Sequence, residues 1–309
     1  MTITTVDLVD KIADLKKQRN AIILAHSYQR PEVQDVADFV GDSLGLSRLA
    51  AATDAEVIVF AGVYFMAETA SILNPSKTVL IPDLEAGCSL SDTITANDVV
   101  VWREENPDGQ VVAYVNTSAE VKALSDVCVT SSNAVEIVRQ LDPNRPIFFL
   151  PDMFLGAFVE GQTGIKMHIW MGECHVHAGI GEKELEETLS AHPNAELMIH
   201  PECSCGSSCL YLRPDAKILS TEGMVQYAQG ADRSEFLVAT EVGIIHRLNK
   251  MAPNKRFIPV KGTAVCEYMK KITLQKVHDS LAENKFVVQV DPEVASKAKR
   301  AIDIMIKFG

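Results

Sequence analysis

Short apolar runs alternate along the 309-residue chain with longer stretches of helical spacing, and this alternation restricts the fold more than any other feature. Short apolar runs bounded by polar residues are typical of strands buried on both faces of a parallel sheet. The runs occupy residues 21–25, 57–61, 78–81, 111–115, 127–130, 147–150, 197–199, 217–219, 236–239 and 256–260. The helical stretches include residues 43–52, 66–73, 119–124, 134–141 and 183–191. The pattern predicts an α/β fold in which parallel sheets carry helices on their faces.

Three isolated cysteines divide the chain into segments of similar length. Cys88, Cys174 and Cys266 are separated by 174 − 88 = 86 and 266 − 174 = 92 residues. Several apolar runs also end in hydroxyl residues that lead into a helix, such as Ser131 and the pair Ser220-Thr221. Such residues cap free helix N–H groups, and these junctions collect ligands in α/β proteins. We therefore expect three similar, small, three-layer α/β units that face one another.

The boundaries of the expected units follow the cysteine spacing. The units cover residues 1–86, 87–171 and 172–269, and we expect the C-terminal helices within 270–309 to pack on the first unit. No low-complexity segment or Gly/Ser linker separates them. The three units should therefore pack closely against one another.

Composition excludes several classes of function. With 29 Lys and Arg against 41 Asp and Glu, the net charge of −12 would repel a phosphodiester backbone, which argues against a nucleic acid partner. No run reaches the roughly 18 apolar residues of a membrane span, and residues 1–19 lack the apolar core of a signal peptide. We therefore expect a cytoplasmic protein with no membrane partner. Seven cysteines argue against a disulfide scaffold and leave packed thiols or metal and redox chemistry as alternatives.

The surroundings of the three isolated cysteines favour a shared ligand set. Cys174 lies in Trp170-Met-Gly-Glu-Cys174-His-Val-His177, which could also be a loop with surface histidines, and this segment lacks the paired spacing of a local zinc site. Cys88 follows a glycine after a strand, and Cys266 precedes a helix, so each is either a packed thiol or a ligand. Three thiolates on a four-iron cubane would leave one iron open to act as a Lewis acid, as in dehydratases.

Polar side chains follow three of the apolar runs. His200-Pro-Glu202 sets an imidazole two residues from a carboxylate, which suits general acid–base catalysis, although an exposed glutamate and a capping histidine are the commoner explanation. His26-Ser-Tyr28 and Tyr114-Val-Asn116 also stand at strand ends, where core tyrosines are the usual alternative. These segments are candidates for the walls of an active site.

The ordered set of motifs resembles the quinolinate synthase family over nearly the whole chain. The motifs are His26-Ser-Tyr28-Gln29, Gly41-Asp-Ser43, Tyr114-Val-Asn116-Thr117, Thr130-Ser131-Ser-Asn133, Trp170-x-Gly-x-Cys174-x-Val-His177, His200-Pro-Glu202-Cys203, Ser220-Thr221-x-Gly-Met224, Thr240-Glu-Val-Gly243 and Cys266-x-x-Met269. No single motif is decisive, and the specificity lies in their order.

The resemblance implies three α/β units around a pseudo-threefold axis, with the active site at the centre. It implies a [4Fe–4S] cluster that receives one cysteine from each unit, namely Cys88, Cys174 and Cys266. The implied catalytic residues are Glu202, His26, Tyr28, Tyr114 and His200. The implied substrate-binding residues are His26, Ser43, Tyr114, Asn116, Ser131, His177, His200, Glu202, Ser220 and Thr221.

The reaction that the resemblance implies joins iminoaspartate to dihydroxyacetone phosphate, releases phosphate and water, and forms quinolinate for de novo NAD biosynthesis. Both substrates are anions, and hydroxyl and N–H donors at helix starts can bind them without a basic patch. Glu202 is the expected base. His26, Tyr28 and His200 are expected to hold or protonate oxygens, and Tyr114 and Asn116 to orient the triose. The expected partners are these small molecules and, transiently, an aspartate-oxidising or aspartate-dehydrogenating enzyme that supplies iminoaspartate.

Other functions stay open on the sequence alone: another iron–sulfur hydro-lyase, a non-catalytic iron–sulfur redox sensor, or a zinc protein. A second set of thiols, Cys203, Cys205 and Cys209, also stays unassigned. Only Cys203 belongs to a motif of the family. The three could bind a second metal, form a regulatory disulfide or pack in the core.

Overall fold

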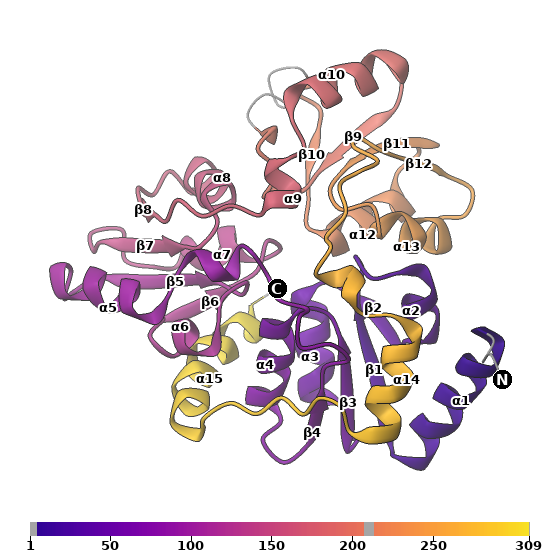
Figure 1. Cartoon of the computed structure of the whole chain (residues 1–309). Helices are drawn as coiled ribbons and strands as arrows, with labels where there is room; N and C mark the ends of the chain where they lie inside the picture. Colours follow the sequence, from indigo (N-terminus) through magenta and orange to yellow (C-terminus); the bar gives the residue numbers. More distant parts are fainter. Residues whose placement is uncertain (1–4, 207–212, 309) are drawn as a thin grey trace.

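The computed structural model describes residues 5–206 and 213–308, and it contains three four-stranded parallel sheets (Figure 1). The first sheet has the order β2 (Phe39–Gly41), β1 (Ala21–His26), β3 (Val57–Ala61) and β4 (Thr78–Leu80). The second has the order β6 (Val127–Val129), β5 (Gln110–Tyr114), β7 (Ile147–Leu150) and β8 (His168–Ile169). The third has the order β10 (Lys217–Ile218), β9 (Glu196–Ile199), β11 (Glu235–Ala239) and β12 (Arg256–Pro259). Each sheet repeats one topology, which confirms the prediction of three similar α/β units.

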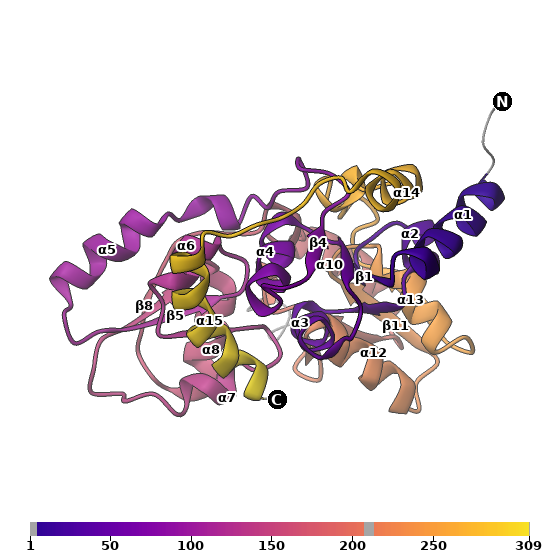
Figure 2. The ribbon, with the colours of Figure 1, turned by 90° about the horizontal axis from the view of Figure 1, so that it is seen from below.

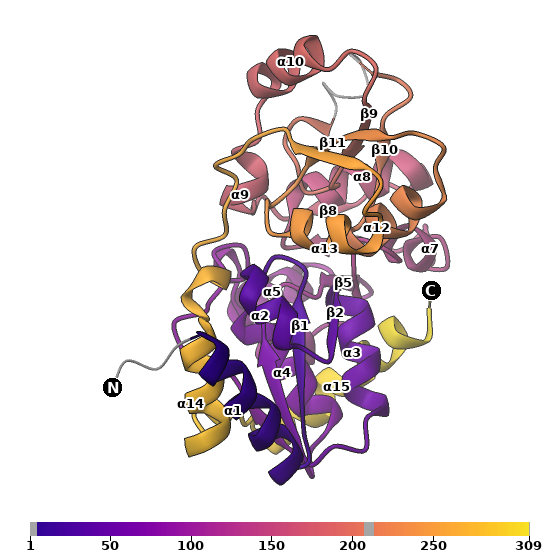
Figure 3. The ribbon, with the colours of Figure 1, turned by 90° about the vertical axis from the view of Figure 1, so that its right-hand side faces the viewer.

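Helices connect the strands and cover the sheets. Around the first sheet lie α1 (Thr5–Gln18), α2 (Pro31–Val36), α3 (Ser43–Ala52) and α4 (Tyr64–Leu73). Around the second lie α5 (Ala96–Glu105), α6 (Ala119–Ala123), α7 (Ala134–Val138) and α8 (Met153–Thr163). Around the third lie α9 (His175–Ala178), α10 (Glu182–Ala191), α12 (Thr221–Gly230) and α13 (Ile244–Met251). Figure 3 shows α12 and α13 between the third sheet and the first unit.

Two edge strands were not expected from the sequence. β2 contains three residues and β8 contains two, and each lies at the edge of its sheet. Both strands expose residues to solvent, so neither gives the continuous apolar run of a strand that is buried on both faces. The strands that the apolar runs predicted are all present, within about one residue at their ends.

Some strand-to-helix junctions are capped by side chains, though not always by the expected hydroxyl. At α7 the N-cap position is Asn133, with no side-chain capping hydrogen bond, so the expected cap by Ser131 is wrong. Ser220 accepts a hydrogen bond from the backbone N–H of Gly223 and caps α12, as predicted. At α3 the cap is Asp42, which accepts from the N–H of Gly45. Because Asp42 satisfies this helix end, the hydroxyl of Ser43 is not needed there and can serve a ligand.

The C-terminal part of the chain lies against two of the units (Figure 2). Helix α14 (Leu274–Glu283) packs on α1. Helix α15 (Pro292–Lys307) packs mainly on α6 and β6, and it also touches α4 and α3. The C-terminal segment thus joins the first and second units, while the boundaries at 86/87, 171/172 and 269/270 stay a prediction.

The hydrophobic core consists of two separate clusters, and the region where the three units meet is polar. One hydrophobic cluster spans the first two sheets and extends to one face of the third, and a second cluster fills the other face of the third sheet. The carboxyl ends of β1, β5 and β9 carry polar residues between these clusters. Among the described residues, no helix is long and apolar enough to cross a bilayer.

Candidate functional site

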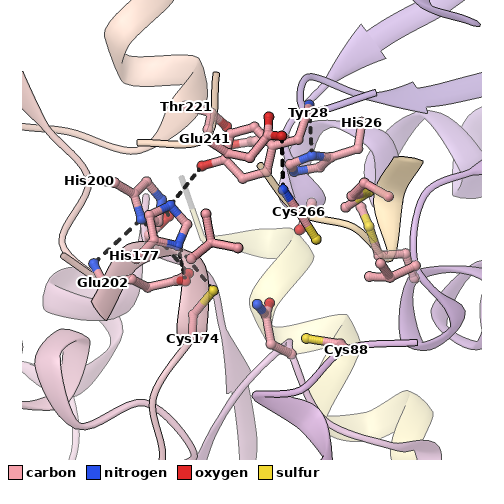
Figure 4. Close-up of a pocket in the computed structure, with 18 of the residues that line it drawn as sticks. His26, Tyr28, Cys88, Cys174, His177, His200, Glu202, Thr221, Glu241 and Cys266 are labelled. Atoms are coloured by element: carbon pink, nitrogen blue, oxygen red, sulfur yellow. Dashed lines mark hydrogen bonds and ion pairs between the residues drawn. The ribbon is translucent and has the colours of Figure 1, made fainter. Parts of the chain in front are cut away.

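A cavity lies where the three units meet (Figure 4). Its walls come from all three sheets, mostly from the segments that follow their strands. The lining residues are His26, Tyr28, Asp42, Ser43, Val63, Phe65, Met66, Cys88, Tyr114, Asn116, Thr130, Ser131, Cys174, Val176, His177, His200, Glu202, Thr221, Glu241, Cys266 and Met269. Of the site residues expected from the sequence, only Ser220 is missing from this set.

The three isolated cysteines converge at one end of this cavity. Cys88 lies in the loop after β4, Cys174 stands at the N-terminus of α9, and Cys266 precedes a short 3-10 turn at Met269–Lys271. Burial, followed by the neighbouring Cys174 thiol, raises the pKa of Cys88 well above its usual range. Burial also raises the pKa of Cys266 to about 12. Thiols this close and this desolvated lose their protons together only when a cation binds them.

His177 joins the thiols to the rest of the cavity. Its Nδ1 lies 3.3 Å from the Cys174 sulfur and 3.0 Å from Oε2 of Glu202. The ligand atoms of Cys174, His177 and Glu202 lie within 4.8 Å of one another and could hold a single metal ion by themselves. The cavity therefore offers two donor sets that share Cys174, one of three thiols and one of mixed ligands.

Glu202 is the centre of a second group of residues, the polar end of the cavity, which adjoins the thiol end at Cys174. It is 3% exposed, it accepts a hydrogen bond from the Tyr114 hydroxyl, and Nδ1 of His200 lies 3.8 Å from its Oε1. Burial alone would raise the pKa of this carboxyl, but the adjacent His177 and His200 lower it to about 2. The carboxylate is therefore ionised and buried, and its charge is balanced by His177.

The three histidines of the cavity differ in charge. Burial lowers the pKa of His200 to about 3, and burial together with His200 lowers the pKa of His26 to about 3. Although burial opposes protonation of His177, the carboxylate of Glu202 and the thiol of Cys174 raise its pKa well above 6.5. The site thus contains two neutral imidazoles and one imidazolium, with the His177 and His200 rings stacked at 4.8 Å.

Thr240 and Glu241 belong to the site although the sequence reasoning did not assign them. The Thr240 hydroxyl lies 2.6 Å from the Tyr28 hydroxyl and 2.8 Å from Nε2 of His177. Glu241 lines the cavity, accepts a hydrogen bond from the backbone N–H of Cys266 and forms an ion pair with Lys270 at 3.0 Å. Both residues directly follow β11, the same position that singled out His26 and His200.

The hydroxyl residues of the cavity lie on α3, the β6–α7 loop and α12, and the amide residue Asn116 lies in the loop after β5. Ser131 Oγ lies 3.3 Å from Nε2 of His200, and the buried Oδ1 of Asn116 has no hydrogen-bond partner among the described residues. Ser43 and Thr221 begin α3 and α12. Ser220 instead caps α12 and lines an adjoining cavity.

The second set of thiols lies outside the central cavity. Cys203 and Cys205 are buried behind β9, and the Cys203 sulfur donates to the carbonyl of Ala239 at 3.2 Å. Neither lines the cavity. Cys209 falls outside the described residues, so the choice among packing, disulfide and second metal stays open.

The fold and the site define a class of protein: a three-unit α/β protein with a central, thiol-bearing cavity that also contains an ionised carboxylate. The family model described as Quinolinate synthetase A protein matches residues 10–307. A Thermus thermophilus protein named quinolinate synthase is 66% identical over 302 residues, which cover 98% of this chain and 97% of that protein. The Pyrobaculum aerophilum protein of the same name is 53% identical over 305 residues, covering 97% and 99%. The chain belongs to the quinolinate synthase family of enzymes.

Proposed function

We propose that this enzyme condenses iminoaspartate with dihydroxyacetone phosphate to form quinolinate, with loss of phosphate and water, as a step of de novo NAD biosynthesis. The observation that carries the proposal is the convergence of three thiols, an ionised carboxylate and two neutral imidazoles on one cavity. The two relatives named quinolinate synthase support this product. Reduced thiols suit a cytoplasmic location, because that compartment keeps thiols reduced.

Cys88, Cys174 and Cys266 are the proposed ligands of a [4Fe–4S] cluster. The donor set fits this group, since three thiols from three units face one cavity, and a bound cation would offset the raised pKa values of Cys88 and Cys266. When bound, the cluster supplies a Lewis acid through the iron that lacks a cysteine. The mixed set of Cys174, His177 and Glu202 would suit a single zinc ion better, and it is the rival that the geometry favours.

Glu202 is the proposed general base. Its low pKa keeps the carboxylate ionised in the free site, and the base becomes stronger when a substrate replaces His177 or Tyr114 at its oxygens. Burial and the Glu202 charge raise the pKa of Tyr114 well above 10, so this hydroxyl keeps its proton for donation to a substrate oxygen. His26 and His200, neutral at pH 7, can each accept one hydrogen bond and donate another.

Binding of two anionic substrates needs donors rather than a general positive field. Among the described lining residues there is no Lys or Arg, and the one cationic side chain is the His177 imidazolium. The hydroxyls of Ser43, Ser131 and Thr221 supply donors, and the unpartnered Oδ1 of Asn116 can accept from a substrate hydroxyl or N–H group. We therefore assign these residues to substrate binding, and iminoaspartate reaches them from a transiently bound aspartate-oxidising or aspartate-dehydrogenating enzyme.

The proposal is tested on protein purified without oxygen. Iron, sulfide and the visible spectrum are measured, and quinolinate is quantified by chromatography after iminoaspartate is generated in situ with dihydroxyacetone phosphate present. We expect about four irons and four sulfides per chain, as a cubane requires, together with quinolinate formation. A loaded cluster without quinolinate would favour another hydro-lyase or a redox sensor. Colourless, zinc-loaded protein would favour the mixed ligand set.

A further inference from the structure

The last turn of α15 ends beside two segments that carry proposed substrate-binding hydroxyls. Arg48, in α3, donates from Nε and Nη2 to the carbonyl of Ile306 at 3.0 and 2.9 Å, and from Nη2 to the carbonyl of Phe308 at 3.0 Å. The final carbonyls of a helix have no partners within the helix and carry partial negative charge, so a guanidinium satisfies them well. The first unit is thereby attached to the end of α15.

Asn133 makes the matching contact from the second unit. Its side chain is buried, and Nδ2 donates to the carbonyls of Met305 and Phe308 at 3.0 Å each. The other side-chain atom, Oδ1, accepts from the backbone N–H of Thr130 at 2.8 Å. One amide group thus connects the C-terminal turn to both ends of the loop 130–133, and Ser131 lies inside this loop.

These contacts lie next to the site without being part of its wall. Arg48 and Asn133 do not line the central cavity, but Arg48 lines the adjoining cavity, which shares Asp42 and Ser131 with it. Ser43 begins the helix that carries Arg48. The C-terminal turn therefore contacts both segments that present Ser43 and Ser131.

We propose that residues 305–308 form a C-terminal clamp that fixes the separation of α3 and the loop 130–133, so that Ser43 and Ser131 meet one substrate anion together. Arg48 and Asn133 are positioning residues in this scheme. The clamp rests on the proposed function, because Ser43 and Ser131 are its proposed substrate-binding groups. Losing it misplaces two hydroxyls relative to each other, which weakens binding more than it slows the chemical step.

The test compares Arg48→Met and Arg48→Lys with a matched control, Arg139→Met. Arg139 stands at the end of α7 and donates to the carbonyl of Gln162 at 2.9 Å, away from the clamp. The readouts in cluster-loaded enzyme are iron content, the Kd of quinolinate by anaerobic equilibrium dialysis, and KM with kcat. For Arg48→Met we expect Kd and KM to rise about tenfold, equivalent to about 1.4 kcal/mol, with kcat and iron content little changed. The Kd and KM of Arg48→Lys should lie between those of the wild type and Arg48→Met. Arg139→Met should have the Kd and KM of the wild type.

Backbone amide hydrogen exchange gives a second readout that does not need a ligand. Exchange in the loop 130–133 and at the start of α3 should accelerate in Arg48→Met and not in Arg139→Met. Because Asn133 is buried, its Ala variant can fail to fold. The Arg48 variants are therefore the ones that test the clamp. Unchanged Kd, KM and exchange would overturn the clamp, whatever happens to Tm. If wild-type enzyme binds no quinolinate, the proposed function fails, and exchange alone then supports or overturns the clamp.

Discussion

The two ends of the central cavity are constructed in different ways. At the thiol end, the three cysteines stand on three loops, and those loops are joined beside the cavity by residues that follow the cysteines. Ser89 Oγ lies 2.6 Å from Nδ1 of His175, and the His175 ring packs edge-to-face on Tyr268 at 5.9 Å. At the polar end, Glu202 and its neighbours satisfy one another through buried hydrogen bonds. Under the proposed function, a cofactor completes the thiol end, whereas Glu202 at the polar end already has its partners within the protein.

Because of this difference, substitutions at the thiol end should remove the cofactor, whereas substitutions at the polar end should reduce turnover. Groups at the polar end are held in position by each other, so a conservative change there should leave the cofactor bound. The thiols depend on the cofactor for their ionised form, so a change there should remove it. The predictions below follow this division, from the largest effect to the smallest.

Replacement of Cys88, Cys174 or Cys266 by Ser should have the largest effect. Each variant should lose the visible colour and most of its iron, and with them quinolinate formation, because two thiols do not hold a cubane. Cys128→Ser is the matched control, since Cys128 is fully buried in β6 and does not line the cavity. Full iron and sulfide in any one of the three variants would remove that cysteine from the ligand set.

Glu202→Gln should retain the cofactor and lose turnover. Gln keeps the shape of the side chain and removes the base, and a positioned base contributes about 10²–10⁴ in rate. Iron content, Tm and quinolinate formation are measured on one sample. Iron loss in this variant would instead support the mixed metal set that includes Glu202. Near-normal turnover would end the assignment of Glu202 as base.

Thr240→Val should have a smaller effect at the same end. The hydroxyl lies between Tyr28 and His177, so its removal takes one orienting hydrogen bond from each. We expect kcat to fall about tenfold, which corresponds to roughly 1.4 kcal/mol, with iron content unchanged. Thr188→Val, in α10, removes a hydroxyl that bonds only backbone carbonyls and serves as the control. Equal kcat in both variants would show that Thr240 has no orienting role.

The affinity for quinolinate should not change between about pH 6 and 8. The pKa of Glu202 is about 2 and those of His26 and His200 are about 3, so the carboxylate is ionised and both rings are neutral throughout this range. A depressed pKa means that these states are lost only as the pH falls toward those values. Equilibrium dialysis across the range is the measurement. A transition centred near about pH 6.5 would show that an ordinary histidine titrates in the site.

The sequence predicted the sheets well and the wall of the cavity only in part. The apolar runs located most of the strands because burial on both faces leaves a continuous signal. β2 and β8 are partly exposed edge strands and gave no such signal. Positions at strand ends identified His26, Tyr114 and Glu202 as candidate wall residues, since α/β proteins bind ligands at the carboxyl ends of their parallel strands.

The sequence could not show which side chains form hydrogen bonds with one another or with the helix ends. Asp42 rather than Ser43 caps α3, and this became visible only when the hydrogen bond to Gly45 was seen. Ser220 is held by its own helix, and only its neighbour Thr221 reaches the central cavity. The contacts of α15 with the second unit likewise depend on packing between distant segments, which no local pattern records.

The most direct test of the account is whether a ligand at the polar end reaches the cofactor at the thiol end. Mössbauer spectra of ⁵⁷Fe-loaded, anaerobic enzyme are recorded with and without saturating quinolinate, with binding confirmed by dialysis. The account predicts that one iron of four changes its isomer shift and quadrupole splitting, because one iron has no cysteine ligand and faces the shared cavity. Unchanged spectra with the ligand bound would contradict it, since the cluster would then be fully ligated and separate from the site.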